Sequence, residues 1–236
     1  MPKKPSKRYN KNSKLIEGVK PLLLKEAVQL LAKFEKAKFN ETVDLAFRLG
    51  VDPKQSDQMV RGTVPLPHGS GKNVRVLVFA KPGPTADAAR AAGAEFVGFD
   101  DMIAKCNQGW VDFDVAVATP EAMVEVRKLG KVLGPRGLMP NPKTGTVTED
   151  TAKAIKEVKA GRVEFKVDKA GNVHVPVGKA AFPPEQIEEN ARAVIEAVAK
   201  ARPASVKGVF LQTCTISATM SPGIRVDTRE FVASAA

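Results

Sequence analysis

The sequence predicts a mixed fold in which an α+β domain, formed from both ends of the chain, encloses an inserted α/β domain. Residues 68–158 alternate short apolar runs with helical patterns, which is typical of a small parallel sheet. Charge is divided in the same way: the 236-residue chain has a net charge of +11, but residues 68–158 contribute only +1. The expected domains are therefore 15–67 with 159–236, and 68–158.

The first terminal segment opens with a strongly basic stretch. Residues 1–14 hold six basic side chains and no acid, which predicts a flexible basic arm. Apolar side chains recur every three or four positions over 24–37, as in an amphipathic helix, and alternate with polar ones over 43–49, as in a half-buried strand. A second strand is expected at 60–66, and the Pro- and Gly-rich stretch 65–71 is a natural domain boundary.

The inserted segment has the order expected of strands joined by helices. Its expected strands are 74–80, 96–97 and 113–118; its expected helices are 85–92, 100–108, 121–129 and 150–160; and 130–145 is expected to be a long loop.

The second terminal segment returns to longer elements. Residues 162–168 and 172–178 resemble two strands of a hairpin, joined by Lys169-Ala170-Gly171. Pro183-Pro184 begins a strong helix that Pro203 ends. A long strand is expected at 206–220.

Composition excludes several classes of protein. The longest apolar runs, such as 76–80, are about five residues, too short for a transmembrane helix. The basic N-terminus lacks a following apolar run, so secretion is not expected. Cys106 and Cys214 are far apart in sequence and form neither a disulfide framework nor a metal pair, which suits a reducing cytoplasm. His68 and His174 lack the neighbours of a catalytic or metal site, so we expect no enzyme, metal or cofactor.

Two loops are alternative candidates for phosphate binding. Gly69-Ser70-Gly71-Lys72-Asn73 resembles the end of a nucleotide-binding loop, but Asn73 stands where Ser or Thr should hold magnesium, and a strand follows it. A nucleotide-dependent enzyme is therefore the weaker alternative. Residues 130–143 carry Lys131, Arg136 and Lys143 without an acid, which fits either phosphate contact or a rigid interdomain connector.

The excess of Lys and Arg indicates a polyanionic partner, either nucleic acid or an anionic membrane surface, and residues 213–220 form a candidate contact surface for RNA. If this stretch is a strand, the hydroxyls of Thr213, Thr215, Ser217 and Thr219 share one face. Hydroxyls both donate and accept, so such a row can contact phosphates and the ribose 2′-hydroxyls that distinguish RNA. The alternative is an ordinary solvated face. One Trp and one Tyr argue against a stacking platform for single strands.

Several motifs resemble one known family. They occur in order along nearly the whole chain from about residue 9: Phe39-Asn40-Glu41-Thr42-Val43, Ser56-Asp57-Gln58-Met59-Val60-Arg61-Gly62-Thr63-Val64, Leu66-Pro67-His68-Gly69, Leu133-Gly134-Pro135-Arg136-Gly137-Leu138-Met139-Pro140-Asn141-Pro142 and Thr219-Met220-Ser221-Pro222. This set is similar to the family of ribosomal protein one of the large subunit, in its bacterial form. Many members have Gly at the position of Ser221.

The resemblance implies a discontinuous terminal domain, an inserted Rossmann-like three-layer domain, and no enzymatic activity. It implies direct binding to 23S rRNA at the mobile stalk of the 50S subunit, assistance in releasing exit-site tRNA, and repression of the protein's own operon through its mRNA. The chain would then be cytoplasmic, on the ribosome. The RNA-contacting positions that it implies are Lys38, Phe39, Thr42, Lys166, Thr213, Ser217, Thr219 and Met220.

Overall fold

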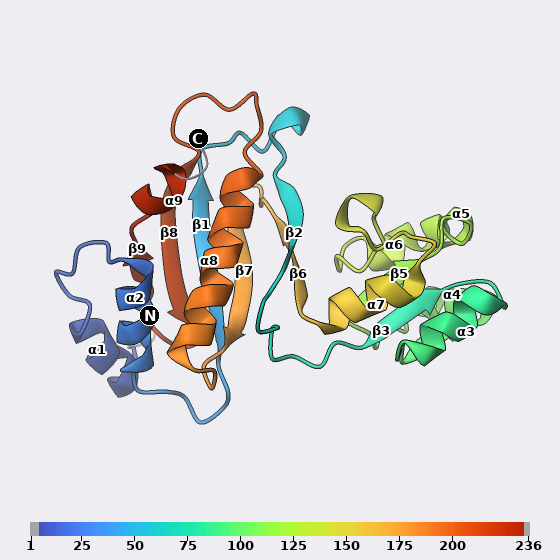
Figure 1. The fold of residues 1–236 in the computed structure, drawn as a ribbon, viewed down its shortest axis with the longest axis horizontal. Helices are drawn as coiled ribbons and strands as arrows, with labels where there is room; N and C mark the ends of the chain where they lie inside the picture. Colours follow the sequence, from blue (N-terminus) through green and yellow to red (C-terminus); the bar gives the residue numbers. More distant parts are fainter. Residues whose placement is uncertain (1–4, 234–236) are drawn as a thin grey trace. The chain divides into compact units, whose positions relative to one another are not determined.

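The chain folds into two compact units (Figure 1). The structure, a computed structural model, describes residues 5–233. Unit 1 combines the two ends of the chain, up to Gly71 and from Val163 onward, and unit 2 is Lys72–Arg162. These borders lie four residues beyond those expected from sequence, because residues 68–71 pack with the terminal unit.

Unit 1 is built on an antiparallel sheet with the strand order β7-β1-β8-β9. A second, two-stranded sheet pairs β2 with β6. The elements, in chain order, are α1 (Lys7–Lys14), α2 (Leu24–Ala32), β1 (Thr42–Leu49), the 3-10 turn η1 (Ser56–Gln58), β2 (Arg61–Pro65), β6 (Arg162–Lys166), β7 (Asn172–Lys179), α8 (Pro184–Lys200), β8 (Leu211–Ala218), β9 (Ile224–Val226) and α9 (Arg229–Ala233).

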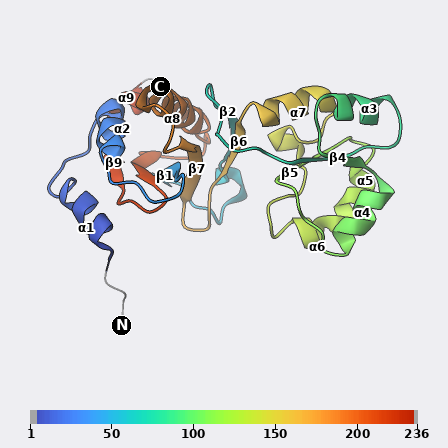
Figure 2. The ribbon, with the colours of Figure 1, turned by 90° about the horizontal axis from the view of Figure 1, so that it is seen from below.

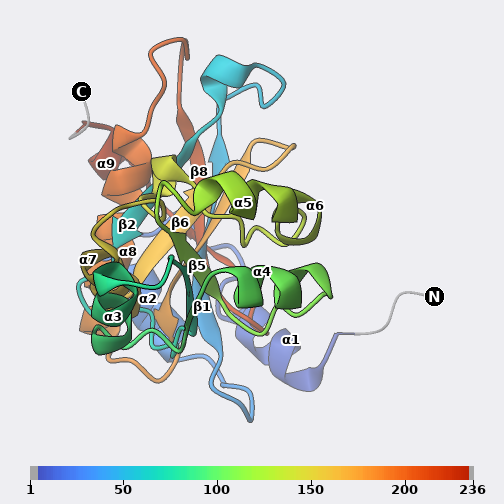
Figure 3. The ribbon, with the colours of Figure 1, turned by 90° about the vertical axis from the view of Figure 1, so that its right-hand side faces the viewer.

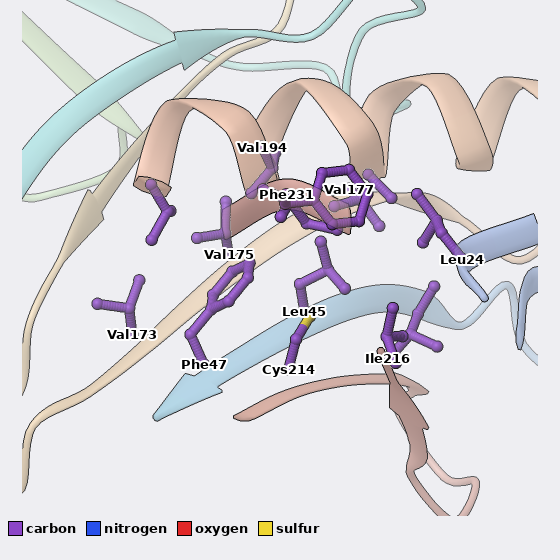
Figure 4. Close-up of a cluster of buried hydrophobic side chains, with 14 of the residues drawn as sticks. Leu24, Leu45, Phe47, Val173, Val175, Val177, Val194, Cys214, Ile216 and Phe231 are labelled. Atoms are coloured by element: carbon purple, nitrogen blue, oxygen red, sulfur yellow. The ribbon is translucent and has the colours of Figure 1, made fainter. Parts of the chain in front are cut away.

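The core of unit 1 lies between this sheet and helices α2 and α8, which Figure 2 shows on the same side of the sheet. Leu45 and Phe47 of β1 are fully buried and point to that side, with Cys214 and Ile216 of β8 (Figure 4). Val194 of α8 packs above them. Each such side chain stabilises the fold by about 1.5–3 kcal/mol. Since side chains alternate along a strand, this burial fixes which residues point to the other face.

Unit 2 is an α/β domain with a parallel sheet, as the sequence pattern predicts, and it has the three layers that the family resemblance implies. Its parallel sheet has the order β4-β3-β5, with α3 and α7 on one side and α4, α5 and α6 on the other (Figure 3). The elements are β3 (Val76–Phe79), α3 (Pro84–Ala91), β4 (Phe96–Gly98), α4 (Asp100–Asn107), β5 (Val115–Ala118), α5 (Met123–Val126), η2 (Arg127–Leu129), α6 (Gly130–Leu133), η3 (Pro142–Thr144) and α7 (Thr151–Lys159).

Three expectations about local structure were wrong. Strands β6 and β7 do not form a hairpin, because β7 pairs with β1 to place its valines in the core. Residues 130–145 are not an interdomain connector: both ends lie within unit 2, and the segment contains α6 and η3. The strand expected at 206–220 is β8, which begins only at Leu211.

The N-terminal arm is also different from the expectation. Lys7–Lys14 forms α1 rather than flexible chain, and the Ser6 side chain caps it by accepting a hydrogen bond from the Tyr9 N–H at 3.2 Å. Asn12 on this helix is only 1% exposed. Lys3 and Lys4 lie outside the described residues. The segment is therefore docked on unit 1 through a polar side chain, which a charge pattern alone does not reveal.

Candidate nucleic-acid interface

The sheet of unit 1 has a polar face opposite the one that packs against α2 and α8. We call it the open face. Its side chains are exposed or half-buried, whereas their neighbours along each strand are buried, apart from Gln212 at the start of β8. The open face comprises Thr42, Asp44, Ala46 and Arg48 of β1; Thr213, Thr215 and Ser217 of β8; Asn172, His174 and Pro176 of β7; and Arg225 of β9.

The hydroxyl row expected from the sequence is present on β8. Strand register places Ser217 opposite Asp44, and Thr213 opposite Arg48. Within residues 5–233, the hydroxyls of Thr213, Thr215 and Ser217 form no hydrogen bond with protein groups. Their donor and acceptor capacity is thus available to solvent or to a ligand.

Thr219 belongs to the end of the sheet rather than to this row. Its hydroxyl accepts the Thr42 N–H at 3.0 Å and donates to the Thr42 carbonyl at 3.2 Å. Its own N–H also donates to that carbonyl, at 3.0 Å. Lys179 donates to the Thr42 hydroxyl at 2.8 Å. Thr219 therefore holds the turn after β8 against the first residue of β1.

Two large apolar side chains are exposed on the two segments that the Thr219–Thr42 hydrogen bonds join. Phe39, before β1, is 55% exposed, and Met220, after β8, is 52% exposed. Lys38 is exposed beside Phe39 and has no ion-pair partner among the described residues. Exposed aromatic and cationic side chains at one end of a polar sheet can stack on a base and contact phosphate. We call Lys38–Thr42 with Thr219–Ser221 the tip.

Ser221 stabilises the turn of the tip from within. Its hydroxyl accepts the Ala218 N–H at 2.9 Å and donates to the Ala218 carbonyl at 3.1 Å. No residue other than Gly has a positive φ in the described part of the chain, so the turn does not require glycine here. The side chain therefore adds bulk at the tip without straining its backbone.

Lys166 lies apart from the tip. It ends β6 in the two-stranded sheet and is exposed. The chain reaches Asn172 of β7 only six residues later, and Asn172 lies opposite Arg48, at the far end of β1 from Thr42. The structure thus brings Lys38, Phe39, Thr42, Thr219 and Met220 together, places Ser217 and Thr213 progressively farther along β8, and does not bring Lys166 to this cluster.

Asp44 is a feature of the open face that the sequence analysis did not select. Burial raises the pKa of its carboxyl, and the charges of His174 and Lys179 partly oppose this rise. A carboxylate repels phosphate but accepts hydrogen bonds from ribose hydroxyls and base N–H groups. It therefore favours partners with donors over bare anions. The alternation of polar residues along 42–48 was the signal that could have identified Asp44 and Arg48.

The remaining candidate residues have structural roles. The backbone N–H of His68 donates to Asn190, and its ring contacts Glu189 at 2.5 Å. Cys106 and Cys214 are buried; burial raises the pKa of both thiols, that of Cys214 to about 12, which keeps them unreactive. Residues 5–233 contain no cluster of three or more potential metal ligands.

The loops considered for phosphate binding have no further support as a nucleotide site. Gly69–Asn73 precedes β3, so it is not the turn between a strand and a helix that a nucleotide-binding loop needs. Lys131 and Arg136 are exposed on unit 2, and the Lys143 side chain lies outside what the structure describes. No helix in the described chain has the length and apolar character needed to cross a membrane.

A basic chain whose sheet presents unpaired hydroxyls, with a cation and an aromatic ring at one end, defines a nucleic-acid-binding protein. The sequence profile of the Ribosomal protein L1p/L10e family matches residues 31–222. The chain therefore belongs to this family, and it is a ribosomal protein of the large subunit that binds rRNA. The match spans both units, including the tip and the whole inserted domain. Members of this family serve as structural RNA-binding proteins rather than enzymes.

Proposed function

We propose that this protein binds 23S rRNA directly at the mobile stalk of the large subunit, and that its RNA site is the tip together with the open face of unit 1. The observation that carries the proposal is the set of unpaired hydroxyls on β8, aligned with the exposed Lys38 and Phe39. Hydroxyls supply contacts to ribose and phosphate, whereas the surrounding cations supply long-range attraction.

We assign the contacting side chains as Lys38, Phe39, Thr42, Thr213, Ser217, Thr219 and Met220, with Lys166 as a separate phosphate contact. Thr42 and Thr219 use their hydroxyls mainly to hold the tip together. Their contribution to RNA binding is therefore the shape of the tip. Thr213 and Ser217 contribute hydrogen bonds directly.

The test is the affinity of a Thr213→Val, Ser217→Ala variant for a stalk RNA fragment. Each lost neutral hydrogen bond is worth about 0.5–1.5 kcal/mol, so the two changes together should raise the dissociation constant about 5- to 150-fold. Binding to an unrelated RNA of equal length should not change. The matched control is the double variant Thr228→Val, Ser205→Ala. It also removes one threonine hydroxyl and one serine hydroxyl, but at positions outside the open face.

Equal losses for cognate and unrelated RNA would contradict the assignment of these hydroxyls. Retention of full cognate affinity would contradict it as well.

We further propose that the same site recognises a similar structure in the mRNA of the protein's own operon, and that the protein assists release of tRNA from the exit site. If one site serves both RNAs, the stalk fragment and the mRNA leader compete. The double variant should then lose repression of a leader-fused reporter in parallel with rRNA affinity. Repression that survives the loss of rRNA binding would contradict a shared site.

A further inference from the structure

Glu41 is a nearly buried carboxylate inside the tip. It is 3% exposed, although it directly precedes β1 and comes after the exposed pair Phe39-Asn40. One of its oxygens, Oε1, accepts the Ala37 N–H at 2.6 Å, and Oε2 lies 3.5 Å from the Met220 N–H nitrogen. Its side chain thus links the two segments that carry Phe39 and Met220.

Arg8 of α1 supplies the opposite charge. Its Nη1 lies 3.2 Å from Glu41 Oε1, and its Nη2 lies 3.5 Å from the Met220 carbonyl oxygen. Among residues 5–233, Arg8 is the one cation that forms an ion pair with Glu41. A buried carboxylate that loses its partner destabilises the fold, so Arg8 compensates the charge of Glu41 and holds its side chain in place.

Asn12 fixes α1 in the position that this ion pair requires. It lies one helical turn after Arg8, on the same face of α1. Its Oδ1 accepts the Glu35 N–H at 3.0 Å, and its Nδ2 donates to the Glu35 carbonyl at 3.2 Å. One side chain therefore satisfies both backbone groups of a residue in the segment between α2 and β1, just before the tip.

From these contacts we infer that α1 is a brace for the RNA site and that Arg8 is a positioning residue for RNA recognition, acting through Glu41. The inference rests on the proposed function of the tip. Bracing fixes the Lys38–Thr42 segment and the Thr219–Ser221 turn before RNA arrives, which reduces the ordering cost of binding. The charge of Arg8 is directed into the protein, so it acts on affinity without contacting phosphate.

The experiment compares Arg8→Gln with Lys14→Gln, in the full chain, over a series of salt concentrations. Lys14 is an exposed residue of the same helix, so both variants lose one positive charge from α1. Arg8→Gln should weaken binding to the stalk RNA fragment about tenfold or more and leave the slope of log affinity against log salt unchanged. Lys14→Gln should stay within about threefold of the parent. A slope that falls by about 0.9 in Arg8→Gln would show a lost phosphate contact and overturn the inference.

A second variant separates positioning from general damage to the fold. Arg8→Gln harms the tip by leaving the Glu41 carboxylate uncompensated, so adding Glu41→Gln should recover part of the lost affinity. Glu41→Gln keeps an acceptor oxygen for the Ala37 N–H. If the double variant binds no better than Arg8→Gln, or if Arg8→Gln equals Lys14→Gln, the inference is wrong.

The parent protein reports on the proposed function independently. A parent that does not distinguish the stalk fragment from unrelated RNA contradicts the function. If the parent protein instead distinguishes the stalk fragment from unrelated RNA while Arg8→Gln binds as tightly as Lys14→Gln, that pair of results contradicts only the role of Arg8.

Discussion

Asn190 of α8 holds the segment that leaves unit 1, and its removal should be costly. The residue is 0% exposed. Its Oδ1 accepts the His68 N–H at 3.0 Å, and its Nδ2 donates to the carbonyls of Gly69 and Val177 at 3.0 and 2.8 Å. Two of these bonds satisfy backbone groups of His68 and Gly69, which belong to no strand or helix, and the third satisfies the carbonyl of Val177 in β7.

Asn190→Ala removes three hydrogen bonds of about 0.5–1.5 kcal/mol each, so the free energy of unfolding of unit 1 should fall by about 1.5–4.5 kcal/mol. Asn190→Asp has the same size but replaces the amide donors with acceptors that face two carbonyl oxygens. It should therefore be at least as destabilising at neutral pH.

Urea unfolding followed by far-UV circular dichroism measures the loss. Trp110, the single tryptophan, lies in unit 2, so its fluorescence follows unit 2 in the same samples. Asn107→Ala, at the exposed end of α4, is the matched control for helix propensity. A loss below about 1 kcal/mol in Asn190→Ala, or tolerance of Asn190→Asp, would refute the proposed role of the three bonds.

Two further predictions concern stability. Because the pKa of Asp44 is raised in the folded state, ionising this group opposes folding; Asp44→Asn should therefore raise the melting temperature at pH 7. This gain in melting temperature should shrink as the pH falls through the raised pKa and vanish below the unfolded-state pKa. Thermal unfolding at several pH values measures it. A gain that does not depend on pH would contradict the claim that ionised Asp44 opposes folding. Gly62→Ala should destabilise unit 1 by about 1–3 kcal/mol, because the added Cβ would lie 2.7 Å from the buried Phe165 ring. Urea unfolding measures this loss, and an unchanged midpoint would contradict it.

Much of the fold follows from local pattern. The alternation over 43–49 and 213–219 gives both the strands and the side chains that face solvent, because a strand buried on one side must alternate. The α/β spacing of residues 68–158 gives the parallel sheet and its helical layers. The charge division separates this domain from the terminal one, with borders only four residues from those of the structure.

The pairing of strands and the placement of α1 do not follow from such patterns. A turn at Lys169-Ala170-Gly171 is compatible with a hairpin, but the valines of β7 are buried only when the strand pairs with β1. Likewise, the cations of 1–14 indicate a solvated arm, and nothing local to that stretch shows that Asn12 meets the backbone of Glu35 or that Arg8 meets Glu41.

The sequence by itself therefore determined the mixed α+β and α/β fold class, the polar side of β8 and the kinship with large-subunit ribosomal proteins, since these depend on composition, period and motif. Only the tertiary structure decided that Thr219 meets Thr42, that Lys166 stands apart, and that α1 docks beside the tip. These contacts join residues far apart in the chain, and their energies depend on burial and on geometry that no local pattern encodes.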